Sequence, residues 1–166
     1  MGGFTLKKMV LALTALITLH AGTLSAAPVN DLGYSATALG IGSDGFYIEH
    51  KLADSFSLGF QTIDYVKAED LYGEFTMSRN VRGIVGNRNF DSSDSKMYLG
   101  MAVNGSLSPQ ANGYASLIAG SQFKELQVGA NFNLSRTTDL NLMYHSYMPD
   151  AGSNKSGLGV GATFKF

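Results

Sequence analysis

The chain has 166 residues, with 20 glycines, no cysteine and a formal net charge of −1. That length predicts one domain. The lack of cysteine excludes disulfides, metal sites with thiolate ligands and a cysteine nucleophile. The near-neutral net charge gives no indication of a basic surface that would bind nucleic acid. Only 15% of the residues are charged although 45% are hydrophobic, which is an unusual balance for a soluble enzyme.

Residues 1–26 have the pattern of a secretory signal peptide. Lys7 and Lys8 give a positive start, residues 9–19 are apolar apart from two threonines, and small residues follow. This apolar run is too short to cross a bilayer, which takes roughly 20 residues. We expect cleavage after Ala26, because cleavage after Ala27 would leave Pro28 at the new amino terminus. The mature domain is then residues 27–166.

The mature chain contains no stretch of 18 apolar residues, so the sequence predicts no membrane-spanning helix. Its dominant signal is instead an alternation of apolar and polar residues, which is typical of β-strands. Residues that favour turns separate ten such segments. In chain order these are residues 32–42, 45–52, 56–66, 71–78, 82–91, 95–107, 113–123, 125–134, 140–148 and 156–166.

Two architectures fit these strands: a soluble barrel or sandwich with an apolar interior, and an outer-membrane barrel with an apolar exterior. The polar face carries Gly, Ser, Thr, Asn, Gln and Tyr with few charges, which suits a crowded interior. The segments are also near the 9–11 residues that cross a bilayer. We therefore predict an all-β, antiparallel up-and-down transmembrane β-barrel of about ten strands, with eight as the alternative.

Aromatic residues fall near the ends of several segments, as the girdles of a membrane barrel would, although some tyrosines point inward by parity. The two predicted rims comprise Phe56, Tyr114, Phe132, Phe164 and Phe166, and Phe46, Tyr65, Phe90, Tyr98 and Phe123.

The last segment ends in a phenylalanine, with apolar residues at every second position before it. These positions are Leu158, Val160, Ala162, Phe164 and Phe166. The pattern resembles the C-terminal assembly signal of small bacterial outer-membrane β-barrel proteins. The resemblance implies folding in the outer membrane with the help of periplasmic chaperones and the barrel-assembly machinery.

The same parity places a set of charged and polar side chains in the lumen. The charged members are Glu49, Lys51, Glu74, Arg82, Arg88, Glu125 and Lys165, and the polar ones are Gln61, Gln127, Asn131, Asn141 and His145. Glu74 is expected to face Arg82 and Arg88 across one hairpin. Buried charges must be paired, so we expect this set to fill the lumen, with a narrow charged pore as the alternative.

Motifs of catalysis are weak. Residues 40–45 match G-x-G-x-x-G, but a strand pattern follows where a phosphate-binding helix would be needed. His145 and Ser146 invite comparison with outer-membrane lipid A deacylases, yet adjacent strand residues point to opposite faces, so the serine lacks its base. Asp91 and Asp94 are expected to be solvated loop carboxylates. We predict no catalytic residues, no metal and no cofactor.

The sequence thus predicts an outer-membrane barrel, not an enzyme, with a structural, surface-interaction or narrow-pore role. Its expected partners are outer-membrane lipid, the assembly machinery and chaperones, with a small solute in the pore alternative and no nucleic acid. The main alternative is a soluble periplasmic or secreted barrel that binds an apolar ligand, and a lipid A-modifying enzyme is a remote one.

Overall fold

The computed structural model describes residues 29–43, 45–91 and 93–166. The expected signal peptide, residues 1–26, lies outside the described residues. Within the described ranges, no helix is long and apolar enough to cross a membrane. The strands are β1 (Thr37–Gly42), β2 (Gly45–Ala53), β3 (Phe56–Ile63), β4 (Ala68–Ser78), β5 (Val81–Phe90), β6 (Ser93–Ser108), β7 (Ala111–Gly120), β8 (Phe123–Asn133), β9 (Thr138–Pro149) and β10 (Lys155–Lys165).

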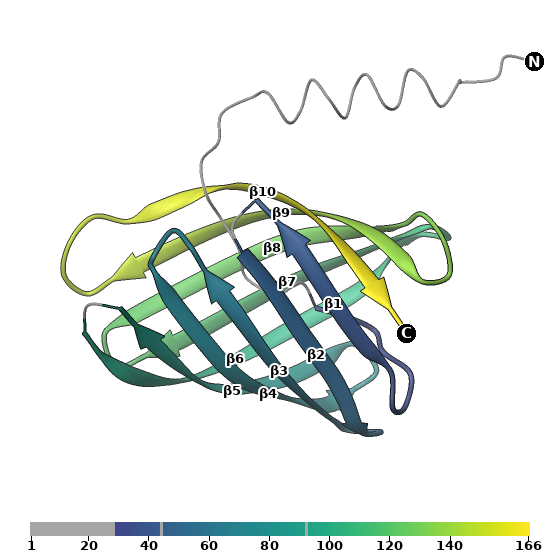
Figure 1. Cartoon of the computed structure of the whole chain (residues 1–166), viewed down its shortest axis with the longest axis horizontal. Coiled ribbons are helices and arrows are strands. Elements are labelled where there is room, and N and C mark those ends of the chain that lie inside the picture. Colours follow the sequence, from purple (N-terminus) through teal and green to yellow (C-terminus); the bar gives the residue numbers. More distant parts are fainter. Residues whose placement is uncertain (1–28, 44, 92) are drawn as a thin grey trace, which may run out of the picture.

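These strands form one closed antiparallel barrel (Figure 1). Each strand pairs with its neighbours in sequence, which short turns allow for antiparallel strands, and β1 closes the sheet against β10. The prediction of ten strands is confirmed, and the alternative of eight is wrong. One boundary matters for the interior: β4 begins at Ala68 rather than Leu71, so Asp70 lies in a strand and not in a turn.

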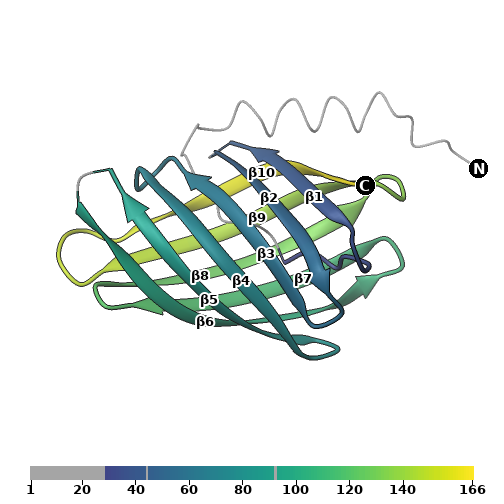
Figure 2. The same cartoon turned by 60° about the horizontal axis from the view of Figure 1, so that its bottom comes forward.

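The two ends of the barrel differ because only one of them carries the carboxy terminus (Figure 2). This end is called the terminal end below. At the terminal end, the backbone N–H of Thr37 donates to the carbonyl of Phe166 at 2.8 Å, and the N–H of Phe166 donates back at 3.0 Å. The turns after β2, β4, β6 and β8 lie at this same end. The other five turns, after β1, β3, β5, β7 and β9, form the distal end, and all nine are short.

Alternation along each strand separates an apolar outer face from a polar inner face. In β8, Leu126 and Val128 are exposed while Gln127 and Asn131 are buried. The inward-facing aromatic residues correct the predicted rims, because the pleat turns the four that lie in strands into the lumen and Tyr65, in the turn after β3, is buried as well. They are Tyr65, Phe90, Tyr98, Tyr114 and Phe123, whereas Phe46, Phe132, Phe164 and Phe166 remain on the outer face.

The glycines give the inner tyrosines room. Four buried tyrosines each lie over a glycine at the directly opposite position of the adjacent strand, where a Cβ atom would overlap the ring. The pairs are Tyr47 with Gly40, Tyr72 with Gly59, Tyr98 with Gly86, and Tyr114 with Gly129. Much of the glycine excess in the composition therefore serves to pack large rings flat against the inside of the wall.

We expect Gly86→Ala to destabilise the barrel by about 1–3 kcal/mol, because overpacking a filled interior forces side chains to shift. The Tyr98 ring cannot move away freely, since it is buried and its hydroxyl donates to Asp70 at 3.1 Å. Urea unfolding in lipid vesicles measures the change.

Gly105→Ala is the matched control, because the nearest atom to its added Cβ is 4.0 Å away. We expect it to change stability by no more than about 0.5 kcal/mol. Equal effects of the two substitutions would contradict the role assigned to the tyrosine–glycine pairs.

Candidate functional site in the barrel lumen

The structure places the whole sequence-predicted lumen set on the inner face of the barrel. Buried members are Glu49, Lys51, Gln61, Glu74, Arg82, Arg88, Glu125, Gln127, Asn131, Asn141 and His145. Lys165 is partly buried, with 21% of its side chain exposed. The residues do not form one cluster. They divide into a central arginine site, a distal aromatic layer and a polar group near the terminal end.

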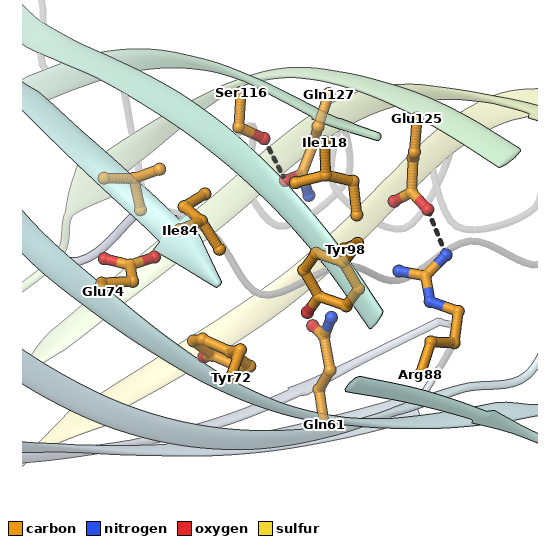
Figure 3. Close-up of a pocket in the computed structure, with 11 residues that line it drawn as sticks. Gln61, Tyr72, Glu74, Ile84, Arg88, Tyr98, Ser116, Ile118, Glu125 and Gln127 are labelled. Atoms are coloured by element: carbon orange, nitrogen blue, oxygen red, sulfur yellow. Dashed lines mark hydrogen bonds and ion pairs between the residues drawn. The ribbon is translucent and has the colours of Figure 1, made fainter. Parts of the chain in front are cut away.

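Arg88 is the centre of the first group. Its Nε and Nη2 donate to the two carboxylate oxygens of Asp70 at 2.7 and 2.8 Å. Its Nη1 donates to Glu125 at 2.6 Å, which is the contact drawn in Figure 3. Bidentate arginine–carboxylate pairs are among the stronger hydrogen bonds in proteins. Gln61 and Tyr98 also donate to Asp70. The site therefore joins strands β3 to β6 and β8 through one carboxylate–arginine network.

This arrangement corrects one predicted pairing. Glu74 receives a hydrogen bond from Arg82 at 3.1 Å, whereas Arg88 pairs with Asp70 and Glu125 instead. Asp70 was missed because the sequence suggested a turn there. The longer β4 places Asp70 directly opposite Arg88 across the hairpin, and this pairing explains the difference.

An aromatic layer lies between Arg88 and the distal end. The guanidinium carbon of Arg88 is 4.7 Å from the centroid of the Phe123 ring, a cation–π contact. Tyr147 stacks on Phe123 with centroids 5.6 Å apart, and Phe90 meets Phe123 edge-on. These rings lie beyond the arginine, on the distal side of the lumen.

His145 lies beside this layer and stacks on Tyr65 with ring centroids 4.2 Å apart. Its ring is fully buried, and neither nitrogen has a partner among the described residues. Ser146, the next residue, belongs to the opposite face of β9. A serine–histidine pair is therefore not assembled at this position.

Near the terminal end, residues 29–36, here called the N-terminal segment, enter the barrel, although Asp31, Gly33, Tyr34 and Ser35 are exposed. Val29, Asn30 and Leu32 are buried. Asn30 donates from its amide nitrogen to Glu49 at 3.0 Å, and Asn131 donates to the carbonyl of Val29 at 3.1 Å. The sequence pattern predicted a strand from residue 32, but β1 begins only at Thr37, so that prediction is wrong for residues 32–36. Residues 29–31 were missed because an irregular stretch has no periodic pattern.

A chain of polar contacts surrounds the N-terminal segment. The hydroxyl of Tyr47 contacts that of Thr163, which donates to Asn141 at 2.7 Å, and Asn141 donates to Asn131 at 2.9 Å. Close by, Lys165 pairs with Asp139 at 2.6 Å. Thr163 and Asp139 were not predicted, although both share the parity of the predicted lumen residues on their strands.

Between the N-terminal segment and Arg88 lies a cavity of about 40 Å³, lined by Val29, Gln61, Tyr72, Glu74, Ile84, Arg88, Tyr98, Ser116, Ile118, Glu125 and Gln127 (Figure 3). A water molecule needs roughly 10–15 Å³ of such space and two to four polar partners. The cavity therefore suits a few waters rather than an organic ligand. Val29 is the residue of the N-terminal segment that lines it, and the rings of Tyr72 and Tyr98 contribute to its wall.

Comparison with known proteins gives only distant matches. No protein-family model and no curated protein matches the chain. A solved structure described as a de novo designed transmembrane β-barrel matches with 14% identity and a TM-score of 0.44, over 82% of this chain and all of that one. Mutants of the Rhodopseudomonas blastica porin match with 12% and 11% identity and a TM-score of 0.41. These matches cover 74% and 80% of this chain, but only 43% and 52% of the porin.

We expect Arg88→Met to destabilise the barrel by about 3–5 kcal/mol, because it leaves two buried carboxylates without their cation. Urea unfolding followed by the heat-modifiable mobility of the barrel on a gel measures the change. The control is the triple variant Arg88→Met, Asp70→Asn, Glu125→Gln, which removes the charges together and should recover most of the stability. A single variant as stable as the wild type would contradict the central role of Arg88.

Proposed function

We propose that this protein is an integral bacterial outer-membrane β-barrel whose filled lumen gives it a structural or surface-interaction role. The main support for the proposal is the apolar composition of the outer face. Large apolar side chains on it are open to the surroundings, such as Met97 and Leu99, which are 69% and 68% exposed. Charged side chains such as Arg88 and Asp70 are fully buried inside. This distribution is the inverse of that of a soluble protein.

The exposed apolar residues occur all around the barrel. They include Ile41, Ile48, Leu58, Leu71, Phe75, Met77, Met97, Leu99, Met101, Val103, Leu107, Leu117, Leu126, Val128, Phe132, Tyr144, Leu158 and Phe164. Soluble monomers rarely expose contiguous apolar patches of more than a few hundred Å². In lipid the same surface is favourable, and a closed sheet satisfies its own backbone hydrogen bonds.

The polar interior argues against the soluble alternative. A soluble barrel that binds an apolar ligand needs an apolar cavity, whereas the cavity here is lined by Glu74, Arg88 and Glu125 among others. The interior also argues against free passage of solutes. The aromatic layer around Phe123 lies across the path on the distal side, and Val29 and Asn30 lie across it on the terminal side. A narrow pore is therefore the second candidate rather than the first.

The remaining parts of the proposal come from the sequence. The signal-peptide pattern of residues 1–26 supports export, and the outer membrane is the membrane in which bacterial barrels reside. Phe164 and Phe166 lie on the outer face of the closing strand, where the assembly machinery and chaperones could contact the apolar pattern of that strand. The short turns between strands leave little surface outside the membrane for binding a large ligand. His145 and Ser146 lie on opposite faces of β9, which supports a role without catalysis.

We expect Met101→Arg to impair membrane insertion, since a charge at mid-barrel on the lipid face costs about 2–4 kcal/mol. Met101 is 53% exposed near the middle of β6. The fraction of protein that becomes protease-resistant in lipid vesicles measures insertion.

Leu107→Arg is the control on the same strand. Leu107 is 68% exposed but lies next to the turn at the terminal end, where the cost falls to about 0–1 kcal/mol. Recovery of the wild-type protein in a detergent-free soluble extract would overturn the membrane assignment itself.

Planar-bilayer recording separates the filled barrel from the pore. We expect the inserted wild-type protein to leave the conductance of the bilayer unchanged, because side chains occupy the lumen. Resolved conductance steps that change in size on Arg82→Ala would instead establish the pore, since Arg82 lies inside the barrel. A known porin inserted in the same bilayer is the positive control.

A further inference from the structure

The distal end of the barrel holds a hollow that is much larger than the central cavity. Its volume is about 490 Å³, against about 40 Å³ for the cavity beside Arg88. We call it the distal hollow, and the residues that line it include Phe90, Gln122, Phe123, Tyr147, Pro149 and Asp150. Pockets that bind small organic molecules measure roughly 300–1,000 Å³. The distal hollow is therefore large enough for such a molecule.

Three aromatic rings from three different strands contribute to its wall. Phe90, Phe123 and Tyr147 belong to β5, β8 and β9. Phe123 meets Phe90 edge-on with ring centroids 6.0 Å apart, and it stacks on Tyr147 with centroids 5.6 Å apart. Because these rings also pack on one another and on Arg88, the barrel holds them in place before any ligand binds.

The polar groups of the distal hollow lie in the turns above these rings. Gln122 and Asp150 follow β7 and β9, and both are exposed. The backbone N–H of Asp150 donates to the carbonyl of Gln122 at 2.9 Å, which joins the two turns. Pro149, the residue before Asp150, pairs with Phe123 across β8 and β9. These contacts hold the Asp150 carboxylate beside the aromatic rings.

The charge of the distal hollow is negative. Among the described residues that line it, Asp150 is charged and no lysine or arginine is present. Arg88 lies behind the rings and is paired with both Asp70 and Glu125, so its charge is already offset. Lys155, at the same end of the barrel, donates to the carbonyl of Tyr65 at 2.9 Å. The distal hollow therefore combines aromatic surface with a carboxylate.

This combination favours one class of ligand. The faces of aromatic rings attract cations, and sites for quaternary ammonium groups are built from such rings. Asp150 repels an anion, and a neutral apolar molecule gains nothing from it. We propose that the distal hollow is a binding site for a small organic cation with an apolar body, which contacts the rings while its charge lies beside Asp150. The site is formed by the end of the barrel and does not depend on the proposed membrane role.

Calorimetric titration of the whole barrel with benzyltrimethylammonium tests the proposal. A maltoside detergent is used, because phosphocholine detergents carry a quaternary ammonium group of their own. We expect saturable binding of one cation per barrel, at least about tenfold tighter than binding of phenylmethanesulfonate, which has the same ring and a negative charge. Equal affinity for the two compounds, or no binding of the cation up to about 10 mM, would overturn the proposal.

Three variants locate the site. Asp150→Asn removes the carboxylate and should weaken binding of the cation at least about threefold. Asp91→Asn is the matched control, because Asp91 is an exposed carboxylate at the same end that does not line the distal hollow, and it should leave the affinity unchanged. Phe90→Leu keeps an apolar side chain but removes one ring, and should also weaken binding about threefold.

Heat-modifiable mobility on a gel shows that each variant still forms the barrel. Wild-type affinity in a folded Asp150→Asn variant would show that the cation binds elsewhere and would overturn the site. That result would leave the membrane assignment standing, because the assignment depends on the outer face and not on the distal hollow.

Discussion

Closure of the sheet by β1 against β10 is the constraint on which the rest of the structure depends. Only five residue pairs make this seam, from Ala38 with Lys165 to Gly42 with Gly161, and the two hydrogen bonds between Thr37 and Phe166 extend it. Once the seam is closed, no strand has a free edge along its paired length, and each strand has one face inside and one outside. Phe166 is therefore hydrogen-bonded to the wall although it follows the end of β10.

A closed wall of ten strands encloses a space that side chains must fill. The tyrosine rings lie flat over glycines, the guanidinium of Arg88 joins Asp70 to Glu125, and Phe123 covers the guanidinium on the distal side. The N-terminal segment occupies the terminal side through Asn30. The contents of the lumen are thus coupled to one another, because each charged group is buried by the layer beside it. An interior held by the ion pairs of Arg82, Arg88 and Lys165, together with an apolar exterior, suits a barrel that spans a membrane.

Much of this could be predicted from the sequence, because strand parity is a local property. Alternation along residues 125–134 predicts that Leu126 and Gln127 lie on opposite faces of one strand, as they do. The turn residues between alternating segments predict the number of strands, which is ten. Parity also placed Arg88 and His145 inside. The partner of Arg88 was not predictable in the same way, because it depends on where β4 starts: a shift of three residues takes Asp70 from a turn to the position opposite Arg88. The N-terminal segment was not predictable either: the pattern extended the first strand back to residue 32, whereas residues 29–36 belong to no strand and reach β2 and β8 through Asn30 and Val29.

Labelling of single cysteines in β8 tests most directly whether the apolar face meets lipid while the polar face is sealed inside. Because the chain has no cysteine, single cysteines can be placed at each position from Leu126 to Asn131 in β8 of the vesicle-inserted protein. We predict that cysteines at Leu126 and Val128 react with a lipid-soluble maleimide and not with a charged one, and that cysteines at Gln127 and Asn131 react with neither. Rapid reaction of the charged reagent at Leu126 and Val128 would instead show that this face meets water and that the barrel does not lie in lipid.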